Sequence, residues 1–292
     1  MLRGMSIPSE IHVFCTEHLG QVLSFEPASG GCINNGGKLT TSQGTFFIKW
    51  NSATLYPGMF AKEKTGLKLL RQAGGITVPL PGEVYEGHEY SCIVMEYIES
   101  GPRARRYWQQ LAEGLASVHH VVSETYGLDH DNYMGSIVQY NPASHNWTDF
   151  FINARLEAQV KLARDHGRMD TRHTRLFKAL YAKLDHILIT EPPCLVHGDL
   201  WSGNIITSEQ GEPALIDPAV SFAHREIDIA MTQLFGSLPR EFYEVYNDVY
   251  PLAHGWQERL DVYNLYPLLV HVNLFGGGYL GQVMHILKGL VG

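Results

Sequence analysis

The pattern of hydrophobic and polar positions begins with extended segments. Thr45–Trp50 is a β-branched and aromatic run, bounded by Gly44 and Asn51. Tyr90–Glu96 is a second run of mainly apolar residues. Short runs of this composition between turn-forming residues are typical of strands. The first hundred residues therefore predict a sheet.

Helical periodicity lies before, between and after these strands. Residues 11–22 predict a short opening helix, and residues 57–72 place Phe60, Leu67 and Leu70 on one helical face. The same period returns at Trp108, Leu111, Ala112, Leu115, Val118 and Val122, and again at Leu176, Leu180, Leu184 and Leu188. We predict an α+β protein with a smaller strand-rich lobe over residues 1–98 and a larger, mainly helical lobe over residues 99–292.

Two charged residues interrupt the apolar pattern of the smaller lobe. Lys49 is the one charged residue in its strand, and Glu63 falls on the apolar face of the following helix. A carboxylate directed at a core is costly unless a cation pairs with it. We therefore expect an ion pair between Lys49 and Glu63.

A glycine-rich turn precedes the strand that carries Lys49. Four glycines fall within residues 30–37, so the backbone there can approach a ligand closely. If that ligand is a phosphate, the candidate contacts are Gly30, Gly31, Cys32, Ile33 and Asn34. The thiol of Cys32 is also a candidate for oxidation, since nearby positive groups would favour the thiolate.

The larger lobe contains a cluster of oxygen-bearing side chains with a distinctive spacing. Asp199 is followed five residues later by Asn204, and Asp217 comes thirteen residues after that. The apolar pairs Ile205-Ile206 and Leu215-Ile216 flank a turn-forming stretch, which predicts a hairpin. A hairpin would bring Asn204 and Asp217 to the same end, where their oxygens suit Mg²⁺ better than a soft metal.

Phosphoryl transfer needs a base, metal ligands and a cation for the phosphates. In the kinase pattern the loop Asp is the base, and the Asn five residues on and the later Asp bind the metal. Asp199 fits the base, Asn204 and Asp217 fit the metal ligands, and Lys49 fits the phosphate-binding cation. Glu63 would then orient Lys49.

These residues resemble the fructosamine-3-kinase, or ketosamine-3-kinase, family, within the aminoglycoside-phosphotransferase-like branch of the bilobal protein-kinase-like fold. The resemblance rests on Gly30–Asn34, Phe46–Lys49, Met59–Glu63, His197–Asn204 and Ile216–Ala219, and it extends through His224–Met231 to Leu274–Gly276. The H-G-D-x-x-x-x-N element marks the wider superfamily. Trp201 and the stretch from His224 to Met231 narrow the resemblance to this family.

The resemblance implies ATP and Mg²⁺ as cofactors and a ketosamine as the acceptor. The amine that carries the sugar would be a free amino compound or a glycated protein lysine, and phosphate would go to the sugar 3-hydroxyl. Glu96, Tyr97 and Ile98 are implied to offer backbone groups to adenine. Trp201 is a candidate wall for the acceptor, and the resemblance places His271 in the acceptor pocket.

Composition narrows the partners and the compartment. The chain has 292 residues with a formal net charge of −8 and no block of basic residues, so we expect no nucleic-acid partner. No stretch reaches the roughly 18 apolar residues that a membrane span needs. The four cysteines are widely spaced, which suits a reducing compartment, and we expect a cytoplasmic protein.

Other functions remain open on the sequence. The acceptor could instead be an aminoglycoside, choline or homoserine, or the chain could be a catalytically silent nucleotide-binding module. Five acidic residues after Asp228 could line an acidic acceptor pocket, although their spacing is typical of a solvated helix surface. Asp228 itself is expected to be structural, receiving hydrogen bonds from the loop around His197. For the oligomeric state we expect a monomer or a weak homodimer.

Overall fold

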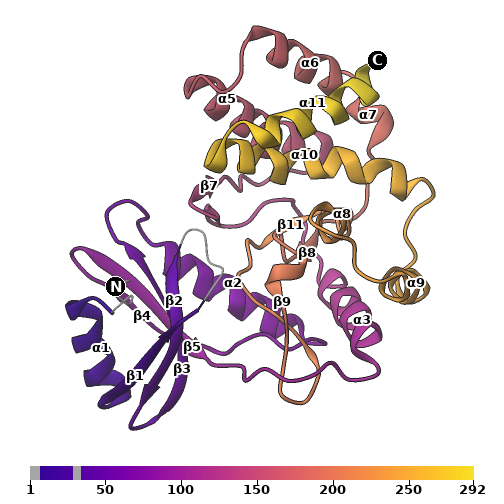
Figure 1. Ribbon diagram of the computed structural model, residues 1–292. Coiled ribbons are helices and arrows are strands. Elements are labelled where there is room, and N and C mark those ends of the chain that lie inside the picture. Colours follow the sequence, from indigo (N-terminus) through magenta and orange to yellow (C-terminus); the bar gives the residue numbers. More distant parts are fainter. Residues whose placement is uncertain (1–6, 29–33) are drawn as a thin grey trace. The chain divides into compact units, whose positions relative to one another are not determined.

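The computed structural model describes residues 7–28 and 34–292, and the described chain divides into two compact units (Figure 1). The first unit consists of the described residues up to 72, together with residues 77–107 and 206–216. The second consists of residues 73–76, 108–205 and 217–292. The boundary at residue 98 that the sequence predicts makes each lobe one continuous stretch of chain. In the structure, residues 206–216 belong to the first unit although they come from the second half of the chain.

An antiparallel sheet of five strands forms the first unit. Its spatial order is β1-β2-β3-β5-β4, and the strands are β1 (Val22–Pro27), β2 (Asn35–Thr41), β3 (Gly44–Ser52), β4 (Pro81–Glu86) and β5 (Tyr90–Glu96). The predicted strands around Lys49 and before Glu96 are confirmed as β3 and β5. Both lie inside the sheet, where their apolar side chains can be buried on two faces.

Helices α1 (Ser9–Leu19) and α2 (Met59–Ala73) cover opposite faces of this sheet (Figure 1). Successive side chains of a strand point to opposite faces. Ile48 and Trp50 of β3 accordingly point to one face, where they form a buried cluster with Ile11, Phe14 and Cys15 of α1 and with Leu39, Cys92 and Val94. Lys49 lies between them in sequence and therefore points to the face covered by α2.

The predicted hairpin after Asn204 is confirmed. Strands β9 (Ile205–Thr207) and β10 (Pro213–Leu215) pair with each other. Thr77 bridges Ala214, and Ser100 bridges Ser208. These two bridges tie the hairpin to segments of the first unit.

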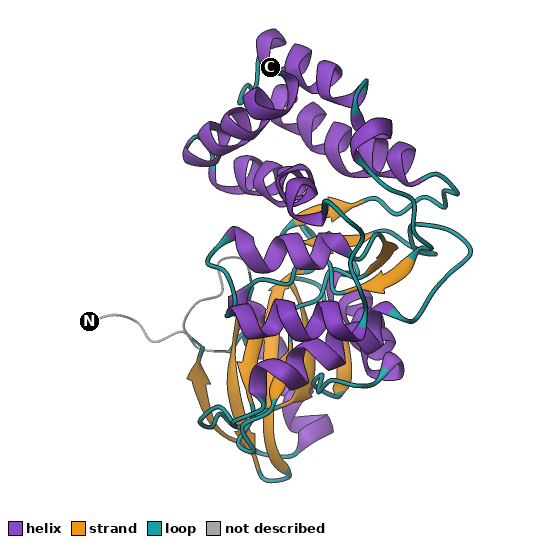
Figure 2. Ribbon diagram, turned by 90° about the vertical axis from the view of Figure 1, so that its right-hand side faces the viewer, coloured by secondary structure: helices purple, strands orange, loops and turns teal. Residues whose placement is uncertain are grey.

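The second unit is mainly helical (Figure 2). Its central helix is α10 (Trp256–Phe275), which packs against α5 (Ala158–Asp165), α8 (Glu226–Leu234) and α11 (Gly278–Val291). The other helices are α3 (Tyr107–His119), α4 (Trp147–Phe150), α6 (Thr171–Tyr181), α7 (Leu184–Ile187) and α9 (Arg240–Val249), with a π-helical stretch at Phe151–Glu157. Across the described ranges, no helix combines the length and the apolar character needed to cross a membrane.

Two short antiparallel strand pairs complete this unit. One pair is β6 (Asn132–Met134) with β7 (Ile137–Gln139), and the other is β8 (Cys194–Val196) with β11 (Ser221–Ala223). Strand β8 leads directly to His197, and β11 begins four residues after Asp217. The two strands therefore position the two segments that carry the predicted chemistry.

The periodicity extended the helix over residues 108–122 too far. Helix α3 ends at His119, and Val122 is 57% exposed rather than buried. Val122 bridges Cys194, and the amide of Leu195 donates to the carbonyl of Val121. Pairing with β8 itself therefore draws this stretch into an extended conformation.

The leucine repeat from Leu176 to Leu188 is also interrupted. Helix α6 ends at Tyr181, and the short helix α7 begins at Leu184. The amide of Lys183 donates to the carbonyl of Leu180, which closes a tighter turn than the α-helix has. The repeat is therefore divided between two helices, although Leu180 and Leu184 are both buried.

Charged side chains are buried in pairs in the second unit. Arg259 donates to both carboxylate oxygens of Glu226, at 2.6 and 2.8 Å, and Arg225 donates to both oxygens of Glu191, at 2.7 and 3.0 Å. Two-point pairing offsets part of the cost of burying these charges. His224 is fully buried beside them, and its Nδ1 accepts from the amide of Glu226.

Burial lowers the pKa of His224 to about 4, and the positive charges of Arg225 and Arg259 act in the same direction against the attraction of Glu191. The folded chain therefore keeps His224 neutral down to about pH 4, whereas the unfolded chain protonates it below about pH 6.5. The free energy of unfolding should fall by about 3 kcal/mol on this account as the pH drops from 6.5 to 4. Denaturant titrations across this range measure it.

The matched variant is His224→Gln, which cannot titrate. Its free energy of unfolding should depend less steeply on pH between 6.5 and 4, whatever its value at pH 7. Parallel pH profiles for the two proteins would contradict the role given to His224.

Candidate active site

The expected ion pair between Lys49 and Glu63 is present in the first unit. The Lys49 ammonium donates to Glu63 Oε1 at 2.6 Å, and Lys49 is only 6% exposed. β3 supplies the lysine and α2 the glutamate, so the pair joins the sheet to its covering helix. This contact restrains the ammonium group of Lys49, which its flexible stem would otherwise leave mobile.

The candidate phosphate-binding turn is only partly covered by the described residues. Gly30, Gly31, Cys32 and Ile33 lie outside them. Asn34 is described, and its Oδ1 accepts a hydrogen bond from Nδ2 of Asn51 at 2.7 Å. This bond fixes the end of the turn to β3, two residues beyond Lys49.

The strand exit predicted to bind adenine has its own contacts. Glu96 Oε2 accepts from the amide of Leu80 at 2.9 Å, and the amide of Glu96 donates to the carbonyl of Leu80. The ring of Tyr97 lies 4.6 Å below the Lys38 ammonium, and Ile98 is half-buried. The Glu96 side chain therefore holds the start of β4, and the adenine role of this backbone stays a prediction.

The loop between β8 and β9 brings the predicted base and one predicted metal ligand together. Nδ2 of Asn204 donates to the Asp199 carbonyl at 2.7 Å and to Asp199 Oδ2 at 3.0 Å. Asn204 is buried, so these bonds satisfy its amide group without water. Because both contacts use Nδ2, the Oδ1 atom of Asn204 is directed away from Asp199.

Asp199 has the electrostatics of a proton acceptor. Burial raises its pKa to about 7, the hydrogen bond from Asn204 opposes this rise, and the negative charges of Asp217 and Asp228 add to it. A base whose pKa lies near the working pH balances proton affinity against availability.

Asp217 lies at the end of the β9–β10 hairpin in an unusual backbone conformation. Its φ is 57°, the one positive value among the described non-glycine residues. Backbone strain of this kind is characteristic of functional sites. Asp217 is exposed, and its carboxylate together with Asn204 Oδ1 gives two hard oxygen donors, a set that fits Mg²⁺ completed by phosphate oxygens.

Asp228 accepts the hydrogen bonds that its sequence position predicts. The amide of His197 donates to Oδ2 at 2.7 Å and the amide of Gly198 donates to Oδ1 at 2.9 Å. Burial disfavours the charge on Asp228, but the hydrogen bonds from His119 and from the Gly198 amide oppose it and lower its pKa overall. The carboxylate therefore stays ionised beneath the loop that carries Asp199.

Sequence reasoning missed the residues that support Asp228. Nε2 of His119, at the end of α3, donates to Asp228 at 3.2 Å, and Nδ1 accepts from the hydroxyl of Tyr246 at 2.7 Å. All three side chains are fully buried. The available signal was a histidine closing the apolar face of α3, and nothing in the sequence indicated its partners.

Gly198 is required by the way two loops meet. Its φ is 82°, and a Cβ at this position would overlap the carbonyl oxygen of Ala219. The amide of Ala219 also donates to the carbonyl of His197 at 2.9 Å. The backbone just before Asp199 therefore lies directly against the segment that follows Asp217.

The two candidate acceptor residues are joined by an aromatic cluster. The ring of Phe235 lies 6.0 Å from Trp201 and 4.8 Å from His271, and Tyr279 lies 4.9 Å from His271. Trp201 is half-buried and covers Gly203, so it is not a core residue. His271 donates from Nδ1 to the carbonyl of Pro267 at 2.8 Å, which leaves Nε2 as an acceptor.

The strand-rich first unit, the Lys49–Glu63 pair and the loop joining Asp199 to Asn204 define the class of kinase-like phosphotransferases. A similar fold occurs in the aminoglycoside phosphotransferase APH(4)-Ia in its complex with AMP-PNP and hygromycin B, with a TM-score of 0.65 and 16% identity over 98% of this chain and 100% of that one. At this identity the similarity concerns the fold alone.

Closer comparisons narrow the class. The model of the family described as fructosamine kinase matches residues 9–292. A probable ketoamine kinase of Enterococcus faecium is 39% identical and the match covers 90% of this chain and 93% of that protein, and the chloroplastic protein-ribulosamine 3-kinase of Arabidopsis thaliana is 37% identical, with 91% and 82% covered. A crystal structure assigned as a fructosamine-3-kinase of Thermobifida fusca has a TM-score of 0.86 and 30% identity, over 98% of this chain and 99% of that one. The chain belongs to the fructosamine kinase family.

The contact between Gly198 and Ala219 predicts a large effect of a single methyl group. Gly198→Ala should lower kcat by roughly 10²-fold, because the Ala219 carbonyl must move and the base shifts with it. The substitution should also destabilise the fold by more than the roughly 1–2 kcal/mol that a left-handed alanine costs. Kinetics and thermal unfolding measure the two effects.

Gly276→Ala is the matched control. Gly276 has a similar φ of 88°, but no atom lies within 4 Å of the added Cβ. This variant should show the conformational cost alone and keep its kcat. Equal activity losses in the two variants would contradict the steric explanation for Gly198.

Proposed function

We propose that this fructosamine kinase transfers the terminal phosphoryl group of ATP to the 3-hydroxyl of ketosamine sugars, with Mg²⁺ bound by Asn204 and Asp217. The observation that carries this proposal is the arrangement around Asp199. Asn204 donates a hydrogen bond to its carboxylate. Burial raises the pKa of this carboxylate to about 7, and the negative charge of Asp217 adds to the rise. A silent nucleotide-binding module has no need for this arrangement.

The residues of the site have defined tasks in the transfer. Asp199 accepts the proton of the attacking hydroxyl, and Asn204 keeps the Asp199 carboxylate in place. Lys49, restrained by Glu63, binds the phosphates. When bound, Mg²⁺ supplies positive charge that neutralises the phosphate oxygens.

The aromatic cluster favours a sugar acceptor. Trp201 offers the partly exposed face of its ring, and sugars commonly pack against such surfaces through their C–H groups. His271 offers Nε2 as an acceptor for a hydroxyl proton, and burial lowers the pKa of His271, which keeps it neutral. A phosphate on the 3-hydroxyl lies beside an enolisable carbonyl and can be eliminated, so the amine is released. Deglycation is the biological consequence of the proposed activity.

An aminoglycoside acceptor is disfavoured by the position of the acidic residues. An acceptor rich in ammonium groups would favour a pocket lined by carboxylates. The five acidic residues after Asp228 are all exposed on the surfaces of α9 and α10: Glu241, Glu244, Asp248, Glu258 and Asp261. They are therefore solvated, as their helical spacing indicates.

The direct test uses Mg-ATP and a small acceptor panel of ribulosyl-lysine, fructosyl-lysine and one aminoglycoside. We expect a mass increase of one phosphate on the ketosamines, and nuclear magnetic resonance should place it on the 3-hydroxyl. Transfer to the aminoglycoside alone, or to another hydroxyl of the ketosamines, would overturn the assignment of the acceptor.

Two variants separate the base from the metal ligand. Asp199→Asn should lower kcat by about 10²–10⁴-fold, the contribution of a general base, while ADP still binds. Asp217→Asn should weaken the binding of ADP in the presence of Mg²⁺, because a metal ligand is lost. Wild-type turnover in Asp199→Asn would refute its role as the base.

A further inference from the structure

A buried amide side chain contacts the segment that follows Asp217. Gln139, at the end of β7, is 2% exposed, and its Nε2 donates to the Ala219 carbonyl at 3.0 Å and to Asn132 Oδ1 at 2.9 Å. Its Oε1 accepts from the hydroxyl of Tyr266, on α10, at 2.9 Å. All the polar capacity of this side chain except one lone pair is therefore used inside the protein.

Asn132 completes the contact from the opposite strand. Asn132 is paired with Gln139 in the β6–β7 register, so both side chains lie on the same face of the hairpin. Nδ2 of Asn132 donates to the carbonyl of Val220 at 2.8 Å. Two amides of one hairpin thus bind two consecutive carbonyls, two and three residues beyond Asp217.

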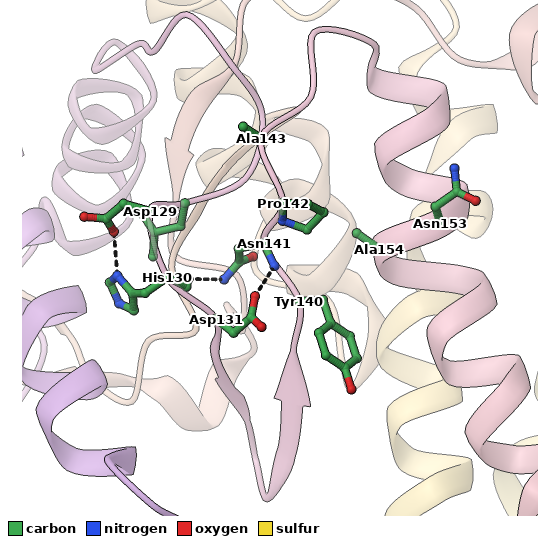
Figure 3. Close-up of a pocket in the computed structure, with 10 residues that line it drawn as sticks. Asp129, His130, Asp131, Tyr140, Asn141, Pro142, Ala143, Asn153 and Ala154 are labelled. Atoms are coloured by element: carbon green, nitrogen blue, oxygen red, sulfur yellow. Dashed lines mark hydrogen bonds and ion pairs between the residues drawn. The ribbon is translucent and has the colours of Figure 1, made fainter.

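The same open end of this hairpin is also held by the residues that flank it in sequence. Asn141 donates from Nδ2 to Asn132 Oδ1 and to the His130 carbonyl, and its amide donates to Asp131 Oδ1 (Figure 3). His130, Asp131 and Asn141 line a surface pocket of about 760 Å³. On the inner side, Arg155 donates to Asn141 Oδ1 at 2.8 Å and to Ser221 Oγ at 3.2 Å. A network without missing partners makes the hairpin a rigid support.

Ala219 contacts both the β6–β7 hairpin and the loop that carries Asp199. Its carbonyl lies against Gly198 and accepts from Gln139, while its amide donates to the carbonyl of His197. The left-handed Asp217 lies two residues before it. Tyr266 supports the contact from α10, since its hydroxyl donates to Oε1 of Gln139.

We propose that Gln139 is a positioning residue that holds the Ala219 peptide, and through it the metal ligand Asp217, in the conformation that binds Mg²⁺. The inference rests on the proposed function, because it uses Asp217 as a metal ligand. Partners that orient metal ligands typically account for 10–100-fold in metal affinity. Gln139 acts through the backbone two residues away, which places its effect near the lower end of this range.

The test measures the affinity for ADP by calorimetry, once with Mg²⁺ and once with EDTA. The ratio of the two affinities is the gain in ADP affinity due to Mg²⁺, and it is obtained without turnover. In Gln139→Leu this gain should fall about tenfold. The ADP affinity in EDTA and the KM for the ketosamine should stay within about twofold of wild type, while kcat falls. A variant that is folded and keeps the wild-type gain would overturn the proposal.

Gln159→Leu is the matched control. Gln159 on α5 is as buried as Gln139, and its Oε1 accepts from Asn273 Nδ2 at 2.9 Å. This variant loses a buried amide of the same size from the same unit, so its melting temperature should fall, but the gain due to Mg²⁺ should not change. A parallel loss of the gain in both variants would show a general structural effect and would overturn the specific role of Gln139.

Tyr266→Phe is the milder second variant, and it decides the matter if Gln139→Leu does not fold. It removes the hydroxyl that donates to Gln139 Oε1 and keeps the ring, so a smaller loss of the Mg²⁺-dependent gain in the same direction supports the proposal and an unchanged gain opposes it. Asp217→Asn separates the two proposals. If Asp217→Asn loses the gain and Gln139→Leu keeps it, the role of Gln139 is wrong and the metal role of Asp217 stands. If the wild-type protein shows no gain, the metal role of Asp217 is wrong as well.

Discussion

The buried carboxylate of Asp228 is the interaction on which the rest of the site depends. It accepts the amides of His197 and Gly198 and is itself bound by His119, with Tyr246 behind. Two oxygens that are both occupied fix the direction of two successive peptide groups, and Asp199 comes immediately afterwards. Removing one partner of such a buried charge typically costs about 3–5 kcal/mol. Stability and the orientation of the base are therefore coupled at this carboxylate.

A second layer of contacts extends from the same loop. The Ala219 peptide lies against Gly198 and donates to His197, and the hairpin of β6 and β7 binds it from the other side. The contacts between the two loops are made by backbone groups, and the contact from the hairpin is made by the side chain of Gln139. The backbone around Asp199 and the segment after Asp217 are therefore held against each other from both sides.

Residues whose chemistry conflicts with their local pattern could be predicted from the sequence. Lys49 in an apolar strand and Glu63 on an apolar helix face each lacked an explanation alone, and together they gave the ion pair that is observed. The spacing from Asp199 to Asn204 and the turn before Asp217 are local, so the loop and the hairpin followed. Asp228 was placed as a structural acceptor because it is an acidic residue in an apolar helix.

The contacts that could not be predicted join residues far apart in the sequence. Gln139 meets a carbonyl 80 residues away, and His119 meets Tyr246 127 residues away. Polar residues of this kind have no periodicity that indicates a partner, because their environment is created only when distant elements pack. The error at Val122 has the same origin: its local pattern is helical, but pairing with the segment around Cys194 gives it an extended conformation.

The absence of space beside Gly198 has a consequence for regulation. Protein kinases carry arginine at the equivalent place in their H-R-D loop, and an arginine there can bind a phosphorylated activation segment. In this chain any side chain at residue 198 would collide with the Ala219 carbonyl. Control by phosphorylation of that kind cannot be gained through a single substitution, because the loop after Asp217 would have to be rebuilt first.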